Sequence, residues 1–220
     1  MKPTTAAHLP QEVSCGTTTI ACEFDRGVIL AADSRTSLGT YVTNRDTDKL
    51  TRLTDNVYCA CSGWAGDAQA VTDRVIYRLE LDVADGYRQA SDVPSVYRVA
   101  KVFQNILGER TGYFKASFIV AGWDVVKGSQ IYALPSSGVL TSQSVACGGS
   151  GSAYILGYVE NQWRCGMKQK ECLAFVRTTL SLAMNRDYAT GGYICVCVME
   201  LGKLVERIVL QPVSPNSALV

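Results

Sequence analysis

Histidine is almost absent from this chain of 220 residues, and its single copy is His8. His8 lies in a short polar stretch, residues 1–15, before the sequence becomes apolar and strand-like from Thr18 onward. If that stretch is removed, the remaining chain contains no histidine. Ser-His-Asp and Cys-His catalysis within the chain is then excluded, and so are zinc sites that depend on histidine.

The sequence also lacks an excess of charge of either sign and a long apolar run. Its formal net charge is +1, which argues against a nucleic-acid or anionic-membrane partner attracted by bulk electrostatics. No apolar run approaches the length of a membrane span, and residues 1–16 lack the apolar segment of a secretory signal. Without such a signal, we expect the nine cysteines to be reduced thiols that are mostly buried.

The order of the predicted elements indicates one layered domain. Apolar spacing predicts helices around Ala68–Leu79 and Ser95–Gly108, because apolar residues recur every three or four positions. A short helix is expected near 153–159, and another helix at about 170–186. Strands are expected at 18–24, 28–33, 57–62, 116–123, 130–134, 193–201 and 203–210, with hairpin turns at 25–27 and around Gly202. Helices grouped between blocks of strands favour an α+β fold over a doubly wound parallel sheet.

The border between the polar start and the apolar chain falls at the Gly16–Thr17 bond. A cut there would place a hydroxyl nucleophile and a free α-amine on Thr17. Such an amine has an unperturbed pKa of about 7.7–8, so it can accept a proton near neutral pH. A threonine hydroxyl can be activated in this way without histidine.

Asp33 and Lys49 are candidates for assisting such a nucleophile. A lysine held by an aspartate supplies a positive charge that eases deprotonation of the hydroxyl and lowers the pKa of the terminal amine. Taken alone, Asp33 is equally typical of a turn at a strand end, and Lys49 of a solvated loop. Spacing in the sequence does not place the two beside Thr17.

Several motifs together carry a resemblance to a known family. They are Gly16-Thr17-Thr18-Thr19-Ile20, Ala32-Asp33-Ser34-Arg35-Thr36, Asp48-Lys49-Leu50, Ser62-Gly63, Ala121-Gly122-Trp123-Asp124, Gly149-Ser150-Gly151-Ser152 and Ala183-Met184-Asn185-Arg186-Asp187. With them, essentially all of the chain after Gly16 resembles catalytic beta subunits of the 20S proteasome. The run Ala70-Val71-Thr72-Asp73 and the segment 149–154 are most similar to the caspase-like subunit at the first beta position.

This resemblance implies a fold, an activity and partners. The fold would be a four-layer α-β-β-α sandwich of the N-terminal nucleophile hydrolase type. Residues 1–16 would be a propeptide removed by self-cleavage, and residues 17–220 a single hydrolase domain. The chain would be a threonine endopeptidase acting on unfolded polypeptides, without cofactor or metal. It would sit in stacked seven-membered rings of beta and alpha subunits, in cytoplasm and nucleus.

The family pattern also assigns roles to matching positions. Thr17 is similar to the nucleophile, Asp33 and Lys49 to the buried pair that tunes it, and Gly63 to the residue whose N–H forms the oxyanion hole. Polar groups around the terminal amine are matched by Ser150, Asp187 and Thr190, the last where the family usually has serine. The substrate pocket is matched by Thr36, Thr47, Thr51, Cys61, Ala65 and Gln69.

Cys61 departs from the caspase-like pattern, which usually has a basic residue at the base of the pocket. A cysteine cannot form a charge-assisted hydrogen bond with a substrate carboxylate. We therefore expect poor cleavage after Asp and Glu, unless Arg45, Arg52 or a neighbouring subunit supplies a cation.

Other interpretations stay open at the level of sequence. A non-catalytic structural beta subunit, or another N-terminal nucleophile hydrolase acting on small molecules, would share much of this pattern. Cys15 or Thr19 could replace Thr17 as nucleophile. The Cys59-x-Cys61 and Cys195-x-Cys197 pairs could bind a soft metal, although small buried side chains are the more common role. The glycine-rich stretch around Ser150 lacks the Gly-Lys-Ser/Thr ending of a P-loop.

Overall fold

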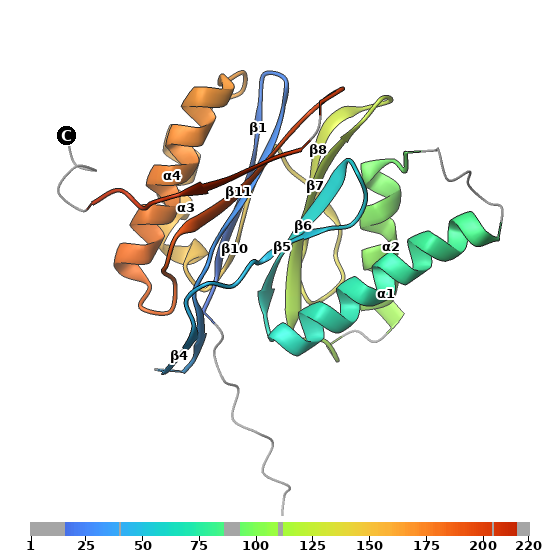
Figure 1. The fold of residues 1–220 in the computed structure, drawn as a ribbon, viewed down its shortest axis with the longest axis horizontal. Helices are drawn as coiled ribbons and strands as arrows, with labels where there is room; N and C mark the ends of the chain where they lie inside the picture. The colour runs from blue at the N-terminus through green and yellow to red at the C-terminus, as the bar shows by residue number, and fades with distance from the viewer. Residues whose placement is uncertain (1–15, 40, 86–92, 110–111, 204, 215–220) are drawn as a thin grey trace, which may run out of the picture.

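Two five-stranded antiparallel sheets form the middle of the molecule (Figure 1). The computed structural model describes residues 16–39, 41–85, 93–109, 112–203 and 205–214. The first sheet has the order β10 (Val145–Gly149), β1 (Thr18–Phe24), β2 (Gly27–Asp33), β11 (Ile194–Glu200) and β12 (Glu206–Leu210). The second has the order β5 (Leu50–Arg52), β6 (Val57–Gly63), β7 (Ala116–Asp124), β8 (Gly128–Leu134) and β9 (Thr141–Ser142). A small separate hairpin pairs β3 (Thr36–Leu38) with β4 (Tyr41–Asn44).

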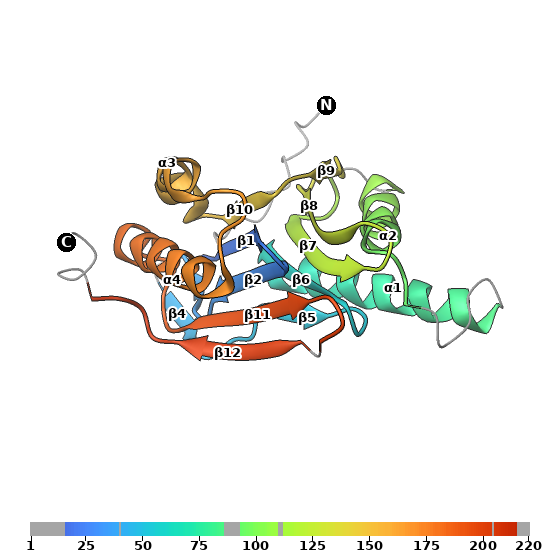
Figure 2. The same ribbon diagram turned by 90° about the horizontal axis from the view of Figure 1, so that it is seen from above.

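Helices cover the outer face of each sheet (Figure 2). The first sheet is covered by α3 (Ser152–Gln162) and α4 (Gln169–Arg186), and the second by α1 (Ala65–Ala84) and α2 (Val96–Glu109). The molecule is therefore a four-layer α-β-β-α sandwich, and the α+β fold class expected from the sequence is confirmed.

Alternate side chains of the central strands enter different cores. In β2, Ile29 and Ala31 pack under α3 and α4, whereas Val28 and Leu30 pack between the two sheets. Both sets are fully buried. A strand of the middle layers therefore has no solvent-facing side, which explains why its sequence is continuously apolar instead of alternating with polar residues.

The observed elements match most of the predicted ones and correct several details. The first turn has two residues, because Gly27 already pairs with Phe24 at the start of β2. The last strand begins at Glu206, not at 203. Gly148 and Gly149 belong to β10 instead of a loop. Predictions that fall on 1–15, including His8 and Cys15, lie outside the described residues.

The described cysteines are all free thiols. Five of the eight are buried, Cys61 and Cys147 are half-buried, and Cys165 is exposed. Burial raises the pKa of Cys147 to about 12 and that of Cys197 to about 11. In the described ranges, no three His, Cys, Asp or Glu side chains gather as a metal site would require. Nor does any helix there have the length and apolarity to cross a membrane.

Candidate active site

Thr17 lies just before β1, and its side chain is buried beside Gly16. Its Oγ1 donates a hydrogen bond to the carbonyl oxygen of Gly16, with 2.7 Å between the two oxygens. A side chain at position 16 would collide with Ala189, whose Cβ lies 2.1 Å from where it would begin. Glycine is therefore required here for close approach of the backbone, and the threonine hydroxyl sits beside the Gly16–Thr17 bond.

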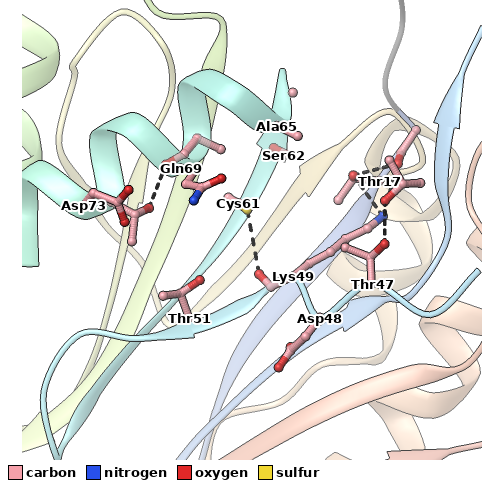
Figure 3. Close-up of a pocket in the computed structure, with 15 residues that line it drawn as sticks. Thr17, Thr47, Asp48, Lys49, Thr51, Cys61, Ser62, Ala65, Gln69 and Asp73 are labelled. Atoms are coloured by element: carbon pink, nitrogen blue, oxygen red, sulfur yellow. Dashed lines mark hydrogen bonds between the residues drawn. The ribbon is translucent and has the colours of Figure 1, made fainter. Parts of the chain in front are cut away.

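The ammonium group of Lys49 lies next to both groups. Its Nζ donates to Thr17 Oγ1 at 3.0 Å, to the Gly16 carbonyl at 3.1 Å and to Asp33 Oδ1 at 2.8 Å. These three acceptors match the three N–H donors of a lysine ammonium. Lys49 is the residue just before β5, and its side chain is directed toward Thr17 (Figure 3).

Asp33 is held at the end of β2 by backbone donors from three segments. Its carboxylate accepts the N–H groups of Thr18 at 3.0 Å, Gly191 at 3.1 Å and Arg35 at 3.2 Å. Burial raises the pKa of Asp33 and lowers the pKa of Lys49, while the opposite charge of each partner counteracts the shift. A buried lysine whose pKa is lowered by desolvation releases a proton more readily than one in water.

A second set of polar groups begins at the backbone nitrogen of Thr17. Ser150 Oγ is 3.3 Å from the Thr17 nitrogen and donates to Asp187 Oδ2 at 2.7 Å. Thr190 Oγ1 donates to the same Asp187 oxygen at 2.6 Å and lies 2.8 Å from Thr18 Oγ1. Asp187 ends α4 as its C-cap residue. The chain of contacts thus connects the Thr17 nitrogen to the last turn of a helix.

The structure joins the predicted groups into one network. Thr17, Asp33, Lys49, Ser150, Asp187 and Thr190 are connected through hydrogen bonds, directly or through Thr18. Lys49 bonds to Thr17 and not to Thr19, so the network favours Thr17 between those two. The extra methyl group of Thr190 does not prevent its hydroxyl from reaching Asp187 and Thr18.

A cavity of about 350 Å³ opens beside Thr17, between the loop that carries Lys49, strand β6 and helix α1 (Figure 3). All six residues predicted for the pocket line it: Thr36, Thr47, Thr51, Cys61, Ala65 and Gln69. Neither Arg45 nor Arg52 does. Arg52 instead forms an ion pair with Asp55. Among the residues that the structure describes, the cation that lines the cavity is Lys49, which is already bonded to Asp33.

Gly63 ends β6 and lines the same cavity as Thr17. Its φ is +103°, and a Cβ at this position would lie 2.3 Å from the carbonyl oxygen of Lys115. Both the backbone angle and the close approach require glycine. Its backbone therefore borders the cavity without a side chain in between.

The sequence prediction missed several lining residues. Asp48, Ser62, Ala68, Thr72 and Asp73 also line the cavity. The lining residues on α1 could have been predicted from their spacing, because positions 68, 72 and 73 lie three, seven and eight residues after Ala65 and so share its helix face.

Comparisons with known proteins agree with this architecture. Residues 13–199 match the family model described as "Proteasome subunit". The chain is 40% identical over 192 residues to "Proteasome subunit beta type-6" of Dictyostelium discoideum, covering 87% of this chain and 88% of that protein. It is 41% identical over 208 residues to "Proteasome subunit beta type-9" of Mus spicilegus, covering 94% and 93%. It is also 41% identical to the protein of that name in Oryzias latipes, over 92% and 91%. The chain therefore belongs to the proteasome subunit family, among its beta-type members.

The hydrogen bonds of Thr190 lead to a first prediction. Thr190→Val keeps the shape of the side chain but leaves the buried oxygens of Asp187 and Thr18 without this partner. We expect the free energy of unfolding to fall by about 1–3 kcal/mol, measured by urea denaturation. Thr190→Ser keeps the hydroxyl and is the matched control, with a loss below about 1.5 kcal/mol from the missing methyl group. Equal losses for the two variants would mean that packing, not the hydroxyl, matters at this position.

Proposed function

We propose that this chain is a catalytic beta subunit of the 20S proteasome, a threonine endopeptidase whose nucleophile is Thr17. The observation that carries the proposal is the position of the Lys49 ammonium group, which bonds simultaneously to Thr17 Oγ1, the Gly16 carbonyl and Asp33. A cation at this place stabilises negative charge on the hydroxyl and on the carbonyl oxygen at once.

The same arrangement supports self-cleavage of residues 1–16. Thr17 Oγ1 attacks the carbonyl carbon of Gly16, and the developing charge on the carbonyl oxygen faces Lys49 Nζ. The Gly16–Thr17 C–N bond then breaks, and the departing nitrogen takes up the proton that the hydroxyl released. Water hydrolyses the resulting ester. The products are a carboxylate on Gly16, and a free hydroxyl and amine on Thr17.

Peptide hydrolysis repeats this chemistry on a substrate. The freed amine of Thr17 accepts the hydroxyl proton, directly or through water, and Oγ1 forms an acyl-enzyme with the substrate carbonyl carbon. The leaving amine takes a proton, and water then releases the acyl group. Gly63 N–H is the proposed oxyanion donor. Ser150 orients the terminal amine, and Asp187, which accepts hydrogen bonds from Ser150 and Thr190, holds Ser150 in place.

Membership of the beta-type family supports a place in the assembled particle. We propose that the chain occupies the first beta position, that of the caspase-like subunit, in a seven-membered beta ring stacked on alpha rings. Its substrates would be unfolded polypeptides, its location cytoplasm and nucleus, and it would need no cofactor. Residues 1–16 are the proposed propeptide and 17–220 the mature domain.

The second candidate is a non-catalytic beta subunit that only completes the ring. Such a subunit has no need for a buried lysine with three acceptors beside a threonine hydroxyl. Burying a lysine and an aspartate costs several kcal/mol per ion before their attraction is counted. Retaining that pair around Thr17 favours the catalytic role.

Self-cleavage is tested by the mass of the assembled subunit. We expect the dominant species to begin at Thr17, because its hydroxyl, the Gly16 carbonyl and Lys49 are already in contact. Thr17→Ala should keep residues 1–16 and lose all hydrolysis by this subunit. Thr17→Ser retains a hydroxyl and should still be cleaved. A wild-type subunit that retains His8 would contradict the proposal.

Replacing Lys49 should block both reactions. We expect Lys49→Ala to slow self-cleavage and peptide hydrolysis by at least about 10²-fold, the scale of removing one donor that stabilises charge in the transition state. Lys170→Ala, which removes an exposed lysine of α4, is the control and should behave like the unmodified chain. The measurement combines intact mass with single-subunit kinetics. Efficient processing of Lys49→Ala would exclude Lys49 from the chemistry.

The cavity lining predicts poor cleavage after acidic residues. Cys61 supplies no cation, burial raises the pKa of its thiol, and Lys49 is engaged by Asp33. A substrate carboxylate would thus be buried without a partner. We expect kcat/KM for Glu before the scissile bond to be at least about tenfold below that for Leu, or about 1.4 kcal/mol. Cys61→Arg should raise the Glu value. A tenfold preference of the unmodified enzyme for Glu would show that a cation reaches the pocket from elsewhere.

A further inference from the structure

The charged groups that line the cavity differ in whether another group of the chain neutralises them. Three charged residues line it: Asp48, Lys49 and Asp73. Lys49 is bonded to Asp33 at 2.8 Å. Asp48 is bonded to both Arg207 Nη2, at 2.6 and 2.8 Å, and the Leu50 N–H. Two of the three charges are therefore already compensated within the chain.

Asp73 differs from the other two charged residues. It lies on α1, one turn beyond Gln69, and its side chain is exposed. Among the residues that the structure describes, none forms an ion pair with its carboxylate. In the view of Figure 3, Asp73 and Gln69 lie on the opposite side of Cys61 from Thr17.

The walls between Thr17 and Asp73 suit a long side chain with a polar end. Cys61, Ala65 and Ala68 are small, weakly polar or apolar residues, and Thr47 and Thr51 add hydroxyl groups to the lining. The hydroxyl of Thr72, which also lines the cavity, is already bonded to the Ala68 carbonyl at 2.8 Å. The methylene groups of lysine or arginine can lie along the first set, while the charged end remains near the second set and near water.

We propose that this cavity accepts a lysine or arginine side chain of the substrate, the residue before the scissile bond, and that Asp73 recognises its positive charge. The inference rests on the proposed function of Thr17 and adds the substrate class. Cys61 is essential to it, because a cation at position 61 would stand between Thr17 and Asp73 and repel the basic side chain. The small neutral thiol of Cys61 allows the basic side chain to reach the Asp73 carboxylate.

The test compares matched peptides that differ only in the residue before the scissile bond. Arginine is paired with citrulline and lysine with norleucine, so that length is kept while the charge is removed; leucine and glutamate complete the set. The enzyme is the assembled particle in which the nucleophiles of the other active subunits are replaced by alanine. Ratios of kcat/KM within one preparation cancel differences in enzyme concentration.

We expect the unmodified enzyme to prefer arginine over citrulline by roughly two- to fivefold, the upper part of the range for a solvent-exposed ion pair. Asp73→Asn should bring this ratio close to 1. Glu80→Gln, which removes an exposed carboxylate from the same helix, is the matched control and should keep the full ratio. Gln69→Glu should increase the ratio, and Cys61→Arg should abolish it.

The outcomes separate this inference from the proposed function. An enzyme that cleaves leucine peptides but treats arginine and citrulline alike would overturn the inference and leave the nucleophile assignment standing. A preference for arginine that survives Asp73→Asn would also overturn it, since another group would then recognise the charge. If no peptide is cleaved, or if Thr17→Ala cleaves as well as the unmodified enzyme, the proposed function itself is wrong.

Discussion

The buried ion pair of Lys49 and Asp33 is the interaction on which the rest of the site depends. Neither charge is stable in this interior alone, and breaking such a pair from one side typically costs 3–5 kcal/mol. Asp33 is held by N–H groups from β1, from the segment after β2 and from the segment before β11. The pair therefore requires the pairing of β1 with β2 and of β2 with β11. Forming this pair also positions Thr17, because the neighbouring Thr18 N–H is one of the donors to Asp33.

The two sheets contribute different parts of the site. The first sheet and its helix α4 supply most of the polar groups around Thr17, because β1 begins, β2 ends and α4 ends close together. Lys49 is the exception, since it immediately precedes β5 of the second sheet. The second sheet and α1 supply most of the cavity walls, through β6 and the helix face that starts at Ala65. The site thus lies where the two halves of the sandwich meet. The fully buried faces of β1, β2 and β6 keep those halves in a fixed relation.

Much of this arrangement was predictable from the sequence, and the exceptions have physical causes. The β1–β2 hairpin and helix α1 were found because apolar residues and turn residues follow clear periods. Strands β3, β4, β5, β9 and β10 were missed because they have two to five residues, too few for a period to show clearly. The proximity of Lys49 to Thr17 was predicted from the resemblance to the family and not from spacing, because hydrogen bonds between distant segments leave no local pattern in the sequence. Thr72 and Asp73 were missed although the face of α1 pointed to them.

In the proposed mechanism, the precursor and the mature site share one geometry. Gly16 fits against Ala189 only because it has no side chain, and this contact holds its carbonyl oxygen within reach of Lys49. The cation and the hydroxyl that would later act on a substrate already face a peptide carbonyl of their own chain. Self-cleavage and substrate cleavage would therefore both require a cation near a carbonyl oxygen that becomes negative. On the proposed mechanism, Lys49 would not have to move between the two reactions, because the departing segment would leave its position to the next carbonyl.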